Sequence, residues 1–175
     1  LYKQSFSKGK PVTVLENVGS TPNRRGTSIQ FSPDPEIFGM ECQFKPSLLY
    51  KMAKSKAYLF AGVEIRWTCS QTLLLENTST IPCNETICYP GGLSDYLIDA
   101  TSGRNLMLSS SFTDKTELEG QRFEWALTWL DHGEDSFFHS YCNTVPTPSG
   151  GTHENGFRHA ITRGMRVYGD LKGQK

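Results

Sequence analysis

The apolar residues near the end of the chain recur with the period of an α-helix. Six of them lie at spacings i, i+3, i+4, i+7, i+8 and i+11: Phe157, Ala160, Ile161, Gly164, Met165 and Tyr168. The basic residues of the same segment take other positions: Arg158, His159, Arg163 and Arg166. This pattern predicts an amphipathic helix with one apolar stripe and one basic face.

A turn of restricted shape precedes this helix. Pro146 and Pro148 fix φ, and the adjacent Gly150 and Gly151 permit backbone angles closed to other residues, so we expect a specific strand-to-helix connection. Thr152 is predicted to cap the helix through its hydroxyl, with Glu154 near the positive end of the helix dipole. The main interpretation of Gly150, Gly151, Thr152 and His153 is a structural turn. An anion cradle at the helix N-terminus is the alternative.

Alternation and turn residues predict the other elements. Helices are expected from Pro46 to Phe60 and from Leu93 to about Ala100. The predicted strands are 1–6, 12–18, 26–31, 63–67, 123–129 and 136–144, the first two and the last two forming antiparallel pairs. Residues 70–85 are polar and irregular and predict an extended, mobile loop without an assigned role. The Ser-, Thr- and Gly-rich segment from Thr101 to Gly120 suggests a domain boundary.

Composition narrows the functional classes. The chain has 175 residues, 37% hydrophobic and 21% charged, with a formal net charge of +0. That balance argues against a free-standing nucleic-acid binder and requires any DNA contact to come from a local patch. No apolar run approaches the roughly 18 residues of a membrane span, so no membrane partner is expected. The chain begins at Leu1 without a methionine, and we expect a piece of a longer protein.

Five cysteines and two glycosylation sequons raise an alternative. The cysteines are Cys42, Cys69, Cys83, Cys88 and Cys142, and the sequons begin at Asn77 and Asn84. The odd count and the absence of a Cys-x-x-Cys pair favour buried free thiols over a disulfide framework or a metal site. A stand-alone extracellular module remains a competing hypothesis. A small hydrolase using His153 and Glu154 is a third, although no nucleophile or metal ligands stand at diagnostic spacing.

Four motifs carry a resemblance to a known family. The run N-T-V-P-T-P-S-G-G-T-H-E-N-G-F-R (143–158) resembles the hallmark of the ATP-hydrolysing B subunits of bacterial type IIA DNA topoisomerases, which are topoisomerase IV and gyrase. The runs R-G-T-S-I-Q-F-S-P-D-P-E-I-F (25–38), F-A-G-V-E-I-R-W (60–67) and Y-P-G-G-L-S-D-Y-L (89–97) resemble further motifs of that family, in the same order. The Pro146-Thr147-Pro148 sequence is more similar to the topoisomerase IV branch, with gyrase as the alternative.

The resemblance implies an α+β fold in two parts. Residues 1–100 would be the C-terminal portion of a Bergerat-type (GHKL) ATPase sandwich, and 101–175 the first part of a ribosomal-protein-like βαβ transducer domain. Thr27 would stand beside the adenine pocket and Gly26 would let its strand approach closely. The alternative for Thr27 is a structural role only, because a β-branched residue suits any strand. Arg158, Arg163 and Arg166 would line the cavity that receives transported DNA, with a solvated helix face as the rival interpretation.

The family's other attributes are expected of the longer protein. These are ATP-dependent double-strand passage, ATP and Mg²⁺ as cofactors, double-stranded DNA and the A subunit of topoisomerase IV as partners, a homodimer of the B chain, and the bacterial cytoplasm. The family's catalytic glutamate, Mg-binding asparagine, adenine-reading aspartate and glycine-rich lid would lie before Leu1, and its glutamine-x-lysine switch beyond this chain. The chain alone is therefore expected to be inactive and to bind no cofactor. Its terminal Gly173-Gln174-Lys175 comes too early to be that switch.

Overall fold

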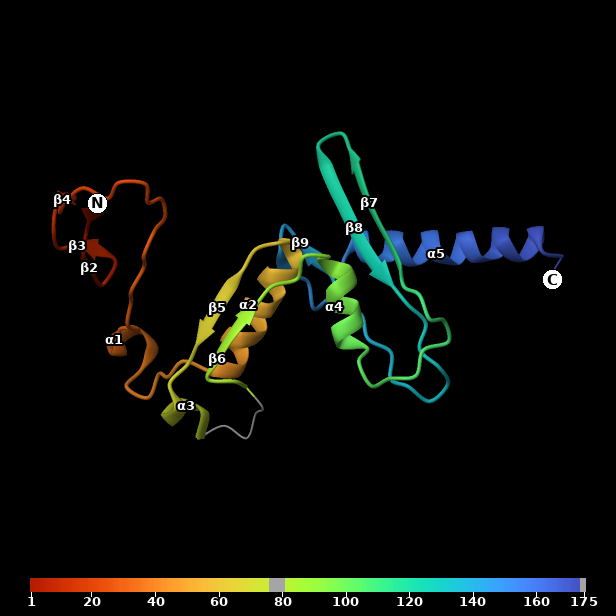
Figure 1. Cartoon of the computed structure of the whole chain (residues 1–175), viewed down its shortest axis with the longest axis horizontal. Helices are drawn as coiled ribbons and strands as arrows, with labels where there is room; N and C mark the ends of the chain where they lie inside the picture. The colour runs from red at the N-terminus through yellow and green to blue at the C-terminus, as the bar shows by residue number, and fades with distance from the viewer. Residues whose placement is uncertain (76–80, 174–175) are drawn as a thin grey trace. The chain divides into compact units, whose positions relative to one another are not determined.

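The computed structural model describes residues 1–75 and 81–173 and divides the chain into two units, Leu1–Lys45 and Pro46–Lys175. Figure 1 shows the elements of each unit along the chain, and the position of one unit relative to the other is not determined. The expected boundary near residue 100 lies inside the second unit and stays a prediction.

The first unit contains a small antiparallel hairpin and one helical turn. Strand β1 (Tyr2–Lys3) pairs with β4 (Glu16–Asn17), and β2 (Phe6–Ser7) pairs with β3 (Lys10–Pro11). Lys8 and Gly9 turn the chain with φ of 49° and 75°, the left-handed angles of a tight hairpin turn. Helix α1 (Pro35–Phe38) begins after Asp34, whose carboxylate accepts the Glu36 N–H at 2.9 Å. The predicted hairpin is confirmed.

The prediction of a strand at 26–31 is wrong. Residues 26–34 have no helix or strand assignment, although the β-branched residues there suit a strand. A strand exists only when a neighbour supplies its hydrogen bonds, and no described segment pairs with this one. All of residues 1–45 are described and none is buried, so this unit has no core of its own.

The second unit begins with a helix and a hairpin. Helix α2 (Pro46–Leu59) has Pro46 in its first turn, where the missing N–H is not needed. Strand β5 (Ile65–Thr68) pairs antiparallel with β6 (Asn84–Ile87), and α3 (Gln71–Leu75) lies between them in the sequence. Helix α4 is Leu93–Ala100. The predicted helices and the predicted strand near 63–67 are confirmed. The 70–85 segment contains α3 rather than only loop, and its residues 76–80 lie outside the described part.

The core of this unit is small. The buried apolar residues of the described part are Pro46, Ala57, Tyr58, Ile87 and Leu97, from α2, β6 and α4. The apolar positions of α2 are only partly covered: Leu48, Leu49 and Met52 are exposed, while Ala57 and Tyr58 are buried. In this chain the contacts of α2 are with α4, β5 and β6.

The last part of the chain is a long hairpin, a short hairpin and a long helix (Figure 1). Strands β7 (Phe112–Leu118) and β8 (Gln121–Leu127) pair through a turn at Glu119 and Gly120. Strands β9 (Tyr141–Cys142) and β10 (Val145–Pro146) form the short hairpin, and helix α5 is Thr152–Leu171. The predicted helix is confirmed.

The predicted pairing of 123–129 with 136–144 is wrong. The partner of β8 is β7, which lies in the segment expected to mark a domain boundary. Every residue of β7 is exposed, so burial leaves no apolar signature in its sequence. Two-residue turns with a glycine at the second position favour hairpins, and Glu119-Gly120 is such a signal.

Candidate functional site

The site with the most polar contacts surrounds the turn between β10 and α5. The Ser140 hydroxyl pairs with the Thr147 hydroxyl at 2.7 Å, and the Thr147 N–H donates to the Ser140 carbonyl at 2.9 Å. The Gly150 N–H then donates to the Thr147 carbonyl at 2.9 Å. These bonds hold residues 140–150 as a folded-back loop that presents Gly150 and Gly151 at the start of α5.

The backbone angle favours glycine at position 150, and a close side chain favours it at position 151. Gly150 has φ of +74°, a left-handed angle, and a Cβ added there would lie 3.1 Å from the Glu154 carboxylate. Gly151 has extended backbone, but a Cβ would lie 2.8 Å from the His153 ring. The His153 ring also lies 3.3 Å from the Thr147 hydroxyl. The predicted geometric role of Gly150, Gly151 and His153 therefore has a specific physical basis.

The first turn of α5 differs from the predicted cap. Gly151 is the N-cap and Thr152 the first helical residue, with no side-chain cap hydrogen bond. The predicted capping role of Thr152 is wrong, because the Gly151 carbonyl accepts the Asn155 N–H and the helix begins one residue earlier than expected. Glu154 lies in the first turn as predicted.

The Glu154 carboxylate occupies the place expected for an anion. It accepts hydrogen bonds from the Ser140 hydroxyl at 3.3 Å and from Arg158 Nε at 3.0 Å. Its side chain is 17% exposed, against 54% for Arg158. A carboxylate already satisfies the positive end of the helix dipole here, which weakens the alternative of an external anion cradle.

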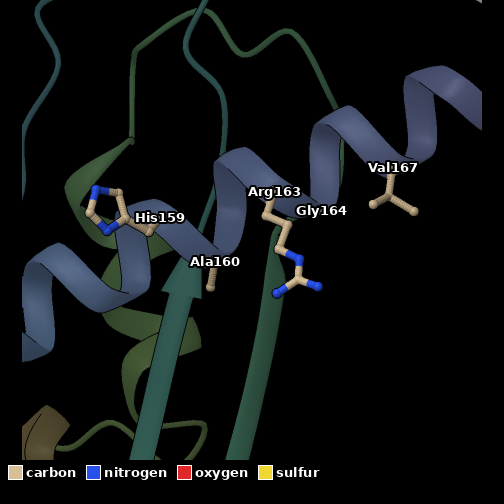
Figure 2. Close-up of a pocket in the computed structure, with 5 residues that line it drawn as sticks. All are labelled: His159, Ala160, Arg163, Gly164 and Val167. Atoms are coloured by element: carbon tan, nitrogen blue, oxygen red, sulfur yellow. The ribbon is translucent and has the colours of Figure 1, made fainter.

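The three candidate arginines do not share one environment. Arg158 is ion-paired with Glu154, and its guanidinium lies 4.3 Å from the Phe138 ring centre. Arg163 lines a shallow surface pocket of about 500 Å³ on α5, with His159, Ala160, Gly164 and Val167, and Figure 2 shows these residues along the helix. All three arginines are exposed. Arg163 and Arg166 are thus the less constrained cations of this helix.

A cluster of aromatic rings connects this site with α2 and α4. The Tyr58 and Tyr141 hydroxyls are hydrogen-bonded to one another, and the Tyr58 ring stacks on Tyr96 at 3.9 Å between centres. The Tyr96 hydroxyl bonds to His139 Nδ1 at 2.6 Å. Burial, followed by the hydrogen bond with Tyr141, raises the pKa of Tyr58, and burial lowers the pKa of His139. Both shifts favour the neutral forms of Tyr58 and His139, since burial disfavours charge.

A second contact joins α2 to the same loop. Lys56 Nζ donates to the Thr144 carbonyl at 2.7 Å and reaches its hydroxyl at 3.0 Å. Thr144 has φ of +66° and Asn143 has φ of +47°, so both central residues of the β9–β10 turn are left-handed. This angle is unusual for a β-branched residue, and the contact with Lys56 helps to hold it.

Four residues of this site were not predicted from the sequence: Ser140, Thr147, Tyr58 and Tyr141. Hydroxyl groups are common on protein surfaces. The spacing of Ser140 and Thr147 does not distinguish them from the other serines and threonines of the chain. The two tyrosines are 83 residues apart, and only the fold brings their hydroxyls together. The sequence contains Tyr89, Tyr96 and Tyr141 in or near the family motifs. These rings favour aromatic contacts, but the sequence does not identify which rings pair.

Gly26 and Thr27 lie in the first unit, in the extended segment without a paired neighbour. Both are exposed, and Gly26 has φ of +150° with no atom within 4 Å of an added Cβ. One pocket lies on α5 and another on the β5–β6 hairpin, and neither is lined by Gly26 or Thr27.

The residues that suggested a hydrolase or a metal site are not arranged as such a site in the described part of the chain. Within residues 1–75 and 81–173, no three His, Cys, Asp or Glu side chains are placed to hold a metal ion. His153 and Glu154 are engaged with Thr147, Ser140 and Arg158, and the turn has no pocket beside it among those found. No helix in these ranges is long and apolar enough to cross a membrane.

The cysteines are free, as predicted, but the expectation that they are buried is wrong. Cys42, Cys88 and Cys142 are exposed, and Cys69 and Cys83 are partly exposed. Cysteine is usually buried when a core is available to take it. The small core of this chain leaves these thiols at the surface.

Comparison with known proteins identifies the relatives. A family model described as DNA gyrase B matches residues 92–175. The DNA topoisomerase 4 B subunit of Caulobacter vibrioides is 46% identical over 98% of this chain, and that of Haemophilus influenzae is 33% identical over 98%. The chain spans 25% and 26% of the length of these two relatives.

Two solved structures share the fold. The 43K ATPase domain of Thermus thermophilus gyrase B, in complex with an aminocoumarin, superimposes with a TM-score of 0.75 at 27% identity, covering 98% of this chain and 44% of that one. The B subunit of DNA gyrase from Myxococcus xanthus gives a TM-score of 0.75 at 21% identity, covering 99% of this chain and 47% of that one.

The fold and the motifs define the class as the B subunits of bacterial type IIA DNA topoisomerases, and the chain belongs to this family. Within it, the two sequence relatives from Caulobacter and Haemophilus are topoisomerase 4 B subunits. The predicted family and the α+β fold class are confirmed. The comparisons favour this family over an extracellular disulfide-bonded module.

Proposed function

We propose that this chain is part of the ATP-hydrolysing subunit of a type II DNA topoisomerase and that it couples ATP-driven closure to the DNA gate. The identity to topoisomerase 4 B subunits over nearly the whole chain is the observation that carries this function. The longer protein would relax and decatenate DNA by ATP-dependent double-strand passage. The chain alone would be inactive.

The domain division proposed here sets residues 1–100 in the ATPase domain and 101–175 in the transducer domain. The contacts across that division support a coupling role. Tyr58 and Lys56 on α2 bind Tyr141 and Thr144 in the β9–β10 hairpin, and α4 packs against β8. A shift of α2 would therefore displace the β9–β10 hairpin, which leads into the turn before α5.

ATP and Mg²⁺ are proposed cofactors of the longer protein. Thr27 would help fix the base and Gly26 would permit a close backbone approach. Thr27 is exposed, and the described ranges contain no group of three His, Cys, Asp or Glu side chains placed to hold a metal ion.

The proposed partners are double-stranded DNA, the A subunit of topoisomerase IV and a second copy of the B chain, in the bacterial cytoplasm. The DNA contact is assigned to α5, because its arginines are exposed and a guanidinium suits phosphate. Arg163 and Arg166 are expected to contribute more than Arg158, which is already paired with Glu154.

The test replaces Arg158, Arg163 and Arg166 by Gln in the full-length protein. DNA-stimulated ATPase activity should fall while ATPase activity without DNA stays nearly constant. The slope of log K against log salt for DNA binding should decrease by about one unit for each phosphate contact that the substitutions remove. Lys115→Gln on β7 is the matched control and should change neither quantity. A lower melting temperature with an unchanged salt slope would return the helix to a structural role.

Gyrase B is the second candidate, favoured by the family model and by the two similar structures. The distinction is made by the reaction of the assembled enzyme. Reconstitution with the A subunit encoded by the same organism should give decatenation and relaxation. Introduction of negative supercoils into relaxed DNA would instead identify a gyrase.

A further inference from the structure

Two cysteines lie on opposite sides of the β5–β6 hairpin at its loop end. The ladder register ends with Thr68 paired to Asn84, and Cys69 and Cys83 are the next residues on each side. The Cys69 N–H donates to the Cys83 carbonyl at 2.8 Å, so the two backbones remain in contact one position beyond the last ladder pair. The two residues are separated in sequence but adjacent in the sheet.

The geometry of such a pair suits a disulfide. Directly opposed residues of an antiparallel ladder that share a backbone hydrogen bond have Cα atoms about 5.5 Å apart, and their side chains leave the same face of the sheet. Disulfides bridge Cα atoms roughly 4.4–6.8 Å apart. The backbone spacing therefore allows a disulfide. The Cys69 Sγ donates to the Ser70 carbonyl at 3.7 Å, so its side chain must rotate toward Cys83. The strand ends must also approach slightly, because facing Cβ atoms lie about 4.5–5.5 Å apart and a disulfide needs roughly 3.5–4.5 Å.

The hairpin end that carries them is held from two sides. Trp67 Nε1 donates to the Pro82 carbonyl at 3.0 Å, which ties the residue before Cys83 to β5. The Trp67 ring packs edge-on against Tyr50 of α2 at 5.4 Å, and the Tyr50 hydroxyl bonds to the Glu85 carboxylate. These contacts keep the strand ends together in the reduced state.

Both thiols are free and partly exposed, so a small reagent has access to them. The other three cysteines lack such a partner in their ladders: Cys142 is opposite Val145, Cys88 follows the last paired residue of β6, and Cys42 lies outside the strands. The local structure thus distinguishes one pair from the rest.

We propose that Cys69 and Cys83 form a reversible disulfide, a modification site that closes the β5–β6 hairpin covalently. The oxidant is a low-molecular-weight disulfide such as oxidised glutathione. One thiolate attacks a sulfur of that disulfide, giving a mixed disulfide and releasing one glutathione thiol. The second thiolate then attacks the protein sulfur of the mixed disulfide and releases the second glutathione. The protein loses two protons and two electrons, and one glutathione disulfide becomes two thiols.

The experiment uses the full-length protein that contains this chain. The native protein is equilibrated in buffers of stepped glutathione redox potential, quenched with acid, alkylated and digested, and the linked peptides are identified by mass spectrometry. A Cys69–Cys83 linkage should be the dominant cross-link among these five cysteines. Scattered pairings, or glutathione adducts without that linkage, would overturn the proposal.

Three variants and one condition sharpen the result. Cys83→Ser should abolish the cross-link and leave Cys69 reduced or carrying glutathione, whereas Cys88→Ser and Cys142→Ser should leave it intact. In denaturant at the same potential, the Cys69–Cys83 fraction should fall by about tenfold or more, because the fold supplies the high effective concentration of one thiol at the other. An equal fraction in the unfolded chain would show that the fold does not cause the pairing and would contradict the proposal.

Discussion

Two family motifs in this chain have opposite structural outcomes. The 143–158 motif forms a turn in which Ser140, Thr147, His153 and Glu154 contact one another, while the 25–38 motif contains an exposed segment without paired strands. The first motif contacts neighbouring loop residues, α2 and the aromatic side chains of β8. The second contains the short helix α1 with its cap at Asp34, and its other contacts are the exposed Lys8–Glu36 ion pair and the Phe31–Phe44 ring pair. A motif is ordered by a chain only when that chain also contains its partners.

The largest expected effect is on the aromatic cluster beside the first motif. Tyr58 is only 4% exposed and contacts Tyr96 and Tyr141. Tyr58→Ala should lower the free energy of unfolding by about 3–5 kcal/mol, because it removes a buried ring and leaves a cavity. Tyr58→Phe should cost only about 1 kcal/mol, the loss of the hydroxyl bond. Chemical denaturation measures both, and equal costs would show that packing of the ring contributes little.

A smaller loss is expected at the turn itself. Gly150→Val places a β-branched side chain at φ of +74° and against Glu154, which should cost about 2 kcal/mol. Gly156→Ala in α5 is the control, since a Cβ there meets nothing within 4 Å and alanine favours the helix. Thermal unfolding should show a decrease for the first and no decrease for the second. A tolerated valine would mean that the turn can adopt another shape.

The β9–β10 turn is expected to gain stability from a glycine. Thr144→Gly relieves the left-handed angle of a β-branched residue, worth about 1–2 kcal/mol, and gives up the Lys56 contact with its hydroxyl, worth about 0.5–1.5 kcal/mol. The central values give a net gain of about 0.5 kcal/mol in unfolding free energy, and the extremes run from a loss of about 0.5 to a gain of about 1.5 kcal/mol. Lys56→Met in both backgrounds separates the two effects. A clear loss in Thr144→Gly would show that the Lys56 contact outweighs the backbone angle.

The smallest effect on folding is expected in the second motif. Thr27 is exposed, so Thr27→Ala should change the stability of this chain by less than about 0.5 kcal/mol. In the full-length protein the same substitution should raise KM for ATP. The isolated chain should give no heat of ATP binding in calorimetry, with or without Mg²⁺. Micromolar binding to the isolated chain would contradict the assignment of Thr27 to an incomplete site.

Local patterns in the sequence were sufficient for several elements. The spacing of apolar residues predicted α2, α4 and α5, and Lys8-Gly9 predicted the first hairpin. The four motifs were sufficient to indicate the family. Helical periodicity and turn residues depend on neighbours a few positions away. They therefore predict helices and turns correctly even in a chain with few buried residues.

Pairing and burial were decided only by the tertiary structure. The exposed strand β7 replaced 136–144 as the partner of β8, Leu48, Leu49 and Met52 of α2 remained exposed, and 26–31 formed no strand. A strand's partner and a helix's buried face depend on segments far away in the sequence or outside it. The same is true of the Tyr58–Tyr141 and Cys69–Cys83 pairs, which the sequence shows only as scattered residues. The sequence alone thus determined the family and the local elements, while the contacts between distant segments, which no local pattern encodes, came from the fold.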